Sequence, residues 1–158
     1  MKCLRLTQPY ARLVALSLKK IETRSGAPHG RGPLAIHAAK TFPVWARDLC
    51  ATSPFRESLA TAGVHRWQDL DVTRGCILAV CALYEVKPLP APINLFGAIP
   101  TWVDDLSEQE RAFGDDSAGR YGLFLRSVVP LNQPIPATGA LGLWEYLLEA
   151  ERGIEVTR

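Results

Sequence analysis

The sequence predicts an α+β fold in which several strands form a β-barrel and one or two helices are inserted between them. Short segments of alternating apolar and polar residues are typical of strands, and the longest apolar run, CILAVCALYEV at residues 76–86, follows the turn residues Arg74 and Gly75. Twelve proline and twelve glycine residues also favour a loop-rich fold. Because strands and helices do not alternate regularly, a doubly wound parallel sheet is less favoured.

The length and composition indicate one globular domain. A chain of 158 residues can bury one sizeable core, and 47% apolar with 22% charged residues is ordinary for a folded protein. We expect a single domain over residues 1–148, followed by a loose charged tail over residues 149–158. The net charge is only +2, so nucleic-acid binding would require a local basic patch.

The N-terminal segment predicts a strand followed by a helix. Residues 2–6 are extended in character, and a helix is expected over about residues 8–17. Thr7 is a candidate N-cap, and Pro9 lies near the first turn, where its missing N–H group costs least.

Residues 20–24 change to a period of two, which is typical of a strand. The alternation places Ile21 and Thr23 on one face and three charged residues on the other, namely Lys20, Glu22 and Arg24. Lys19 lies at the junction between helix and strand. Exposed ion pairs on a solvated strand face are a common alternative for such a charged pattern.

The next segments alternate between turns, strands and helices. Residues 25–32 form a turn-rich loop, and residues 33–39 predict a strand. Residues 43–63 have helical spacing through Val44, Trp45, Leu49, Phe55 and Leu59, with a break expected at Pro54.

The C-terminal half contains an irregular segment and a last pair of strands. Residues 88–105 are rich in proline and have little periodicity, and Ser107 with Glu110 predicts a capping box. Strands are expected at about residues 120–129 and 137–143.

Targeting and cysteine patterns favour a soluble, cytoplasmic protein. Polar residues interrupt the apolar N-terminal run, so a signal peptide is not indicated, and no segment reaches the 18 apolar residues of a membrane span. The four cysteines, Cys3, Cys50, Cys76 and Cys81, have no metal-binding spacing. We expect them to be buried free thiols, and we expect no metal or cofactor.

Four segments in order resemble the ASCH (activating signal cointegrator homology) family. They are LRLTQPYARLVALSLKKIETR, RGPLAIHAAK, GRYGLFLRSVVPL and PATGALGLWE, which together reach from about residue 3 to residue 146 with an unmatched middle. The family motif contains Gly-x-Lys-x-x-Glu-x-Arg, which aligns with Lys19, Glu22 and Arg24. Ser17 replaces the motif glycine, and Ser25-Gly26 stands where an aromatic residue often follows the arginine.

The resemblance implies a PUA-like β-barrel with a cleft that binds RNA or a nucleotide-type ligand. Such a cleft requires donors for phosphate oxygens, an acceptor for a base amine and a ring for stacking. Arg24 and Lys19 are the expected donors, Glu22 the expected acceptor, and Gln8 and Tyr10 the further contacts. Lys20 does not match the motif and is expected either at the surface or as a peripheral phosphate contact.

Further residues are candidates for the rim of the cleft. His37 lies within the matched strand, Arg31 and Lys40 flank that strand, and Arg120 with Tyr121 begins a late strand. Ordinary surface charge explains the basic residues equally well. The four tryptophans, Trp45, Trp67, Trp102 and Trp144, are interpreted as packing residues, although Trp102 is also placed at a possible cleft mouth.

Two other functions remain open. Some relatives of the family deacylate modified cytosine nucleosides with a lysine and a threonine three residues later, and a ribonuclease activity has been proposed for others. Here Glu22 occupies the threonine position, which disfavours that mechanism but leaves Lys19 and Glu22 as an acid–base pair. A protein-interaction module using residues 88–102 is the third possibility.

Overall fold

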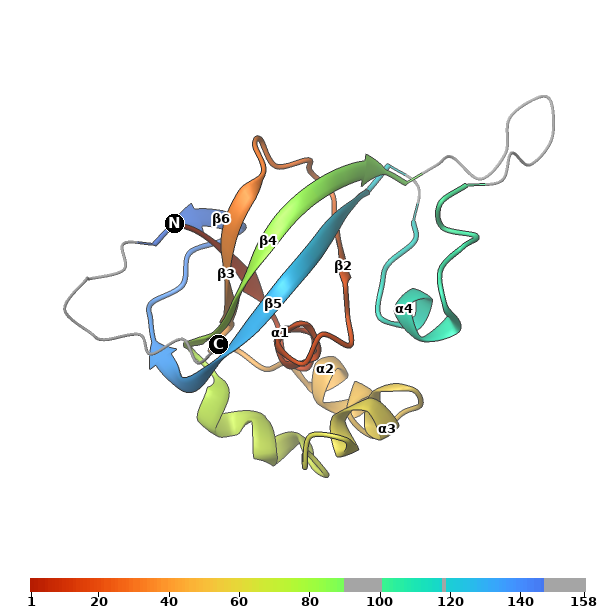
Figure 1. Cartoon of the computed structure of the whole chain (residues 1–158). Helices are drawn as coiled ribbons and strands as arrows, with labels where there is room; N and C mark the ends of the chain where they lie inside the picture. The colour runs from red at the N-terminus through yellow and green to blue at the C-terminus, as the bar shows by residue number, and fades with distance from the viewer. Residues whose placement is uncertain (90–100, 118, 147–158) are drawn as a thin grey trace.

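The computed structural model describes residues 1–89, 101–117 and 119–146 (Figure 1). The strands and helices follow one another along the chain as β1 (Lys2–Leu6), α1 (Tyr10–Ala15), β2 (Ile21–Arg24), β3 (Gly32–Ala38), α2 (Val44–Leu49), α3 (Phe55–Ala60), the 3₁₀-helix η1 (Trp67–Thr73), β4 (Cys76–Pro88), α4 (Glu108–Ala112), β5 (Tyr121–Pro136) and β6 (Leu143–Glu145).

All six strands belong to one sheet in the order β2-β5-β4-β3-β1-β6. The β1–β3 pair is parallel and the other pairs are antiparallel. The long strands β4 and β5 bend across the molecule, so the sheet curls into a half-barrel with α1 against it (Figure 1). The α+β class expected from the sequence is confirmed.

The curled sheet separates two apolar clusters. Alternate residues of β1 and β3, including Leu4, Leu6 and Ile36, pack with Val14 of α1. Residues of opposite parity, among them Ala35, pack on the other face of the sheet. This division follows from the two-residue period of strands. The strand predicted over residues 33–39 is therefore observed as β3, with Leu34 and Ile36 on one face and Ala35 on the other.

Helix α1 begins and ends through unusual local contacts. The sequence predicted Thr7 as the N-cap, but Pro9 occupies that position and has no side-chain cap of its own. The Gln8 side-chain oxygen instead accepts a hydrogen bond from the Arg12 N–H group at 3.0 Å. After the helix, Ser17 has a left-handed backbone with φ of 60°, the conformation that a glycine adopts most readily.

In helices α2 and α3 the buried residues differ from those predicted for residues 43–63. The break at Pro54 is observed, since α3 begins directly after it. The buried side of α2 is formed by Ala46 and Cys50, whereas Val44 and Trp45 are exposed. Residues four apart share a helix face, so burying Ala46 and Cys50 directs the two larger side chains outward.

Two predictions in the C-terminal half need correction. Strand β5 runs without interruption to Pro136, and residues 137–142 precede β6 without forming the predicted strand 137–143. Ser107 caps α4 by accepting from the Glu110 N–H group, but the Glu110 carboxylate contacts Lys20 and Ile21 instead of completing a capping box. Most of the proline-rich segment 88–105 and the tail 149–158 lie outside the described residues.

The four cysteines are buried and free, as expected. Among the described helices, none combines the length and apolar character required to cross a bilayer. Within the same residues, no group of three or more His, Cys, Asp or Glu side chains is arranged to hold a metal ion.

Candidate functional site

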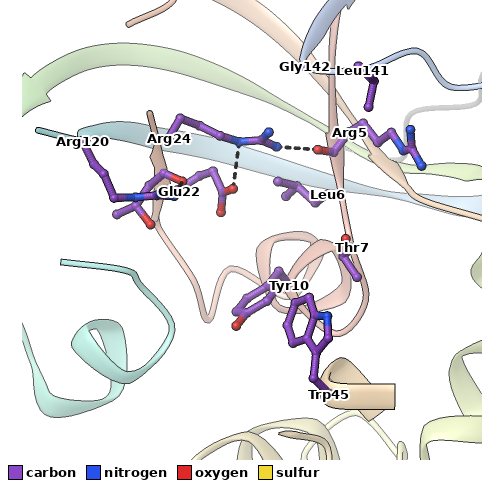
Figure 2. A pocket seen from close by; sticks show the side chains of 11 residues that line it. Arg5, Leu6, Thr7, Tyr10, Glu22, Arg24, Trp45, Arg120, Leu141 and Gly142 are labelled. Carbon is purple, nitrogen blue, oxygen red and sulfur yellow. Dashed lines mark hydrogen bonds and ion pairs between the residues drawn. The ribbon is translucent and has the colours of Figure 1, made fainter. Parts of the chain in front are cut away.

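A pocket of about 360 Å³ lies where the curled sheet brings β2 toward β1 (Figure 2). These strands stand near opposite ends of the sheet order, and β6 pairs with β1 only over Lys2–Leu4. We call this cavity the seam pocket. It is lined by Arg5, Leu6, Thr7, Tyr10, Glu22, Thr23, Arg24, Trp45, Arg120, Leu141 and Gly142.

Arg24 spans the gap between the two strands. Its Nε atom lies 3.0 Å from Glu22 Oε1, and its guanidinium donates a hydrogen bond to the main-chain carbonyl of Arg5 (Figure 2). One arginine therefore links β2 to β1 where the backbones are not paired. The Arg24 side chain is still 30% exposed, so part of it faces the pocket.

Lys19 contacts the Glu22–Arg24 pair from the interior of the protein. Its side chain is completely buried, and Nζ donates to the carbonyls of Ile21 and Phe113, both at 2.6 Å. Nζ also lies 3.6 Å from Glu22 Oε2. Lys19 does not line the pocket, so its side chain is not placed for the expected ligand contact there, and the expected acid–base partners Lys19 and Glu22 form an ion pair with the lysine buried. Its position instead fixes the Glu22 carboxylate.

Arg120 supplies a second guanidinium at the seam pocket. It donates to the Thr23 carbonyl at 3.1 Å and lies 3.2 Å from Asp115 Oδ2, with 28% of its side chain exposed. Hydrogen bonds from Ser117 and the charge of Arg120 lower the pKa of Asp115. Asp115 therefore stays ionised near neutral pH and holds Arg120 in place.

Two aromatic rings complete the pocket. Tyr10 projects from the start of α1 and Trp45 from α2, and Figure 2 shows both below the Glu22–Arg24 pair. Trp45 is 56% exposed, an unusual position for the largest apolar side chain. Burial, followed by the charges of Glu22 and Asp115, raises the pKa of Tyr10, so its hydroxyl remains a neutral donor.

Some predicted site residues lie away from this pocket. Gln8 is fully buried, and its amide nitrogen donates to Thr73 Oγ1 at 2.9 Å, so it is a structural residue of α1. Arg31 is exposed and contacts the carbonyls of Pro28 and Gly30 within its own loop. Tyr121 pairs with Arg24 in the sheet and packs against the core.

His37 and Lys40 belong to a different cavity, described below. The seam pocket thus brings together four of the predicted residues, Tyr10, Glu22, Arg24 and Arg120. Lys20 is exposed, as expected for a residue outside the motif.

The sequence interpretation missed seven lining residues, namely Arg5, Leu6, Thr7, Thr23, Trp45, Leu141 and Gly142. The exposure of Trp45 could have been predicted from the sequence. Val44 and Trp45 are adjacent, and a short helix cannot bury both while it also buries Ala46. The other six residues carry no local signal. No aromatic residue follows Arg24 directly, and the aromatic rings of the pocket come from Tyr10 and Trp45 instead.

The seam pocket combines groups with distinct chemical uses. The partly exposed guanidiniums donate to anionic oxygens, Glu22 accepts hydrogen bonds, and the two rings offer faces for stacking. Every charged group is already fixed by a neighbour, so the arrangement exists before a ligand arrives. Such preorganisation lowers the entropic cost of binding.

Comparison with known proteins gives a likeness among solved structures. No protein-family model and no curated protein matches the chain. Among solved structures, it is similar to the crystal structure of ASCH from Zymomonas mobilis, with 15% sequence identity and a TM-score of 0.49. The aligned region covers 94% of this chain and 87% of that chain.

Proposed function

We propose that the protein binds RNA or a nucleotide-type ligand in the seam pocket. The observation that carries this proposal is the convergence of two partly exposed guanidiniums, from Arg24 and Arg120, with the exposed ring of Trp45 in one cavity. Nucleotides combine anionic oxygens with a planar base, and these groups match the two kinds of side chain.

The size of the pocket suits one nucleotide unit. Its volume of about 360 Å³ lies in the range of small-molecule sites. We assign the base to the rings of Trp45 and Tyr10, because base–aromatic stacking contributes about 1–3 kcal/mol per base. Arg24 and Arg120 then bind phosphate or polar base edges.

Glu22 gives the pocket selectivity within this proposal. Its Oε1 atom contacts Arg24 and its Oε2 atom faces buried Lys19, so the carboxylate is fixed between two cations. A fixed carboxylate accepts hydrogen bonds from an exocyclic amine and repels a nearby phosphate. Bases with an amine at their edge are therefore the favoured ligands.

Salt-dependent binding of a labelled single-stranded RNA tests the proposal. Replacing both Arg24 and Arg120 by alanine removes two cations, so the log–log slope of affinity against salt should ease by about 1.4. A double Arg56→Ala, Arg66→Ala variant is the matched control, because both arginines are exposed and neither lines the pocket. An unchanged slope, or an equal change in the control, contradicts the proposal.

A Trp45→Ala variant provides a second readout. Because Trp45 is exposed, its removal should leave the thermal midpoint nearly unchanged while affinity falls about tenfold, the equivalent of one lost stacking contact. Trp102→Ala does not serve as a control, since that ring packs against Phe124. Val72→Ala does, because Val72 is 82% exposed and lies outside the pocket.

A further inference from the structure

A second cavity, of about 680 Å³, lies at one end of the sheet. Here β1 and β3 end, β4 begins and β5 finishes, which places Arg5, His37, Cys76 and Pro136 close together. We call this cavity the basic pocket. It is lined by Arg5, His37, Lys40, Arg74, Gly75, Cys76, Pro136, Ala137, Thr138 and Gly139. Three of these side chains are permanently cationic, namely Arg5, Lys40 and Arg74, and none is a carboxylate.

The three cations converge on the turn after β3. The Arg74 guanidinium donates to the Lys40 carbonyl at 3.2 Å and is oriented by Asp71, 3.0 Å from its Nε atom. Arg5 reaches Thr41 Oγ1 at 3.5 Å. The Lys40 side chain is exposed, and its Nζ atom has no ion-pair partner among the described residues. A concave basic surface of this kind attracts anions.

A buried histidine forms the inner wall of the basic pocket. His37 is 1% exposed, and its Nε2 atom contacts the Ala137 carbonyl at 3.0 Å. Its Nδ1 atom is buried without a hydrogen-bond partner among the described residues. Gly139 packs so closely on the ring that a Cβ atom there would lie 2.5 Å from His37 Cε1. The segment after β5 is thereby seated on the pocket wall.

The basic pocket and the seam pocket adjoin each other. Arg5 lines both, and Figure 2 shows its guanidinium directed away from Arg24 while its carbonyl faces the seam. The segment 137–142 also borders both cavities, with Thr138 and Gly139 at the basic pocket and Leu141 and Gly142 at the seam. One ligand can therefore contact both cavities across Arg5.

We propose that the two pockets together bind a single-stranded nucleic acid longer than one nucleotide. This inference rests on the proposed function of the seam pocket, which takes a base, and adds that the basic pocket takes a neighbouring backbone phosphate. Arg5, Lys40 and Arg74 supply the donors, and Arg5 sets the path of the strand. No carboxylate lines the basic pocket, whereas Glu22 lines the seam pocket and offsets part of the positive charge of Arg24.

The experiment compares ligand length. Binding of the four ribonucleoside monophosphates and of an unstructured RNA octamer containing all four bases is measured for wild type, Lys40→Ala and Trp45→Ala. Lys87→Ala is the control, because Lys87 lies near the opposite end of β4 and outside both pockets. Lys40 and Lys87 are both partly or fully exposed, so folding is preserved in each variant.

We expect wild type to bind the octamer more tightly than any monophosphate. Lys40→Ala should weaken octamer binding and ease its salt slope by about 0.7, with monophosphate binding unchanged. Lys87→Ala should alter neither. A Lys40→Ala protein that binds the octamer like wild type, or loses affinity only as much as Lys87→Ala does, overturns the inference.

The two proposals fail differently. If Trp45→Ala weakens both ligands and Lys40→Ala weakens neither, the seam pocket stands and the extended path is wrong. If Lys40→Ala weakens the octamer and Trp45→Ala has no effect on either ligand, the seam pocket does not hold a base, and the basic pocket acts alone.

Discussion

Lys19 carries a charge in a part of the protein that excludes water. Burying an ammonium group is costly unless its donors are all engaged, and here two carbonyls and the Glu22 carboxylate surround Nζ. The contact with Phe113 also ties β2 to the segment after α4. Lys19 thus positions Glu22 and Arg24 without touching the pocket.

Replacing Lys19 by methionine tests this role. The substitution keeps the length of the side chain but leaves two buried carbonyls unpaired, so the free energy of unfolding should fall by about 3–5 kcal/mol. Urea unfolding measures the change. Lys20→Met is the matched control, since Lys20 is exposed and its substitution should stay within about 0.5 kcal/mol. Equal effects of the two variants would place Lys19 in solvent.

Buried thiols give a second prediction at the residue scale. Burial raises the pKa of Cys81 to about 12, above the 9.0 of a free thiol. The stability that this neutral thiol contributes is fully present below about pH 9 and is lost as pH rises toward 12, because the unfolded chain ionises first.

The free energy of unfolding should therefore decrease less steeply between about pH 9 and pH 11 in Cys81→Ala than in wild type. The comparison of slopes removes the titration of lysines and tyrosines, which both proteins share. Parallel curves for the two proteins would mean that Cys81 is accessible to water.

At the scale of elements, strand β2 is held by contacts outside the sheet. The Glu110 carboxylate accepts hydrogen bonds from the N–H groups of Lys20 at 3.0 Å and Ile21 at 2.8 Å. Thr23 Oγ1 accepts from the Asp115 N–H group at 2.9 Å. Helix α4 and the segment after it therefore fix the edge strand that carries Glu22 and Arg24.

A Glu110→Ala variant should loosen this edge. We expect a loss of about 1–3 kcal/mol and faster hydrogen exchange at the amides of residues 20–24, because two donors lose their acceptor. Glu108→Ala is the control from the same helix, since Glu110 and not Glu108 accepts the hydrogen bonds from Lys20 and Ile21. Unchanged exchange in Glu110→Ala would show that pairing with β5 alone holds the strand.

Local patterns predicted the elements better than they predicted contacts between elements. The period of two at residues 20–24 identified β2 and the shared direction of Glu22 and Arg24. Gln8 and Lys19 were predicted to contact the ligand, but the fold buries both side chains. A polar residue near a motif does not indicate whether the fold buries it. Arg5 and segment 137–142 join the site only through the curl of the sheet.

At the scale of the whole molecule, the half-barrel creates the candidate site. A sheet with β2 at one end and β1 near the other leaves backbone edges that face each other across a gap. Arg24 bridges that gap, and α2 presents Trp45 beneath it. We propose that a ligand enters the half-barrel at this open seam.

The proposed function requires a nucleobase to stack on Trp45 in this seam. The most direct measurement is a nucleotide titration followed through the indole N–H signals of the four tryptophans in a two-dimensional NMR spectrum. We predict that the Trp45 signal shifts progressively, and that Trp67, packed against Phe42, and Trp102, bonded to the Pro88 carbonyl, stay in place. A Trp45 signal that does not move while RNA binds would contradict the account.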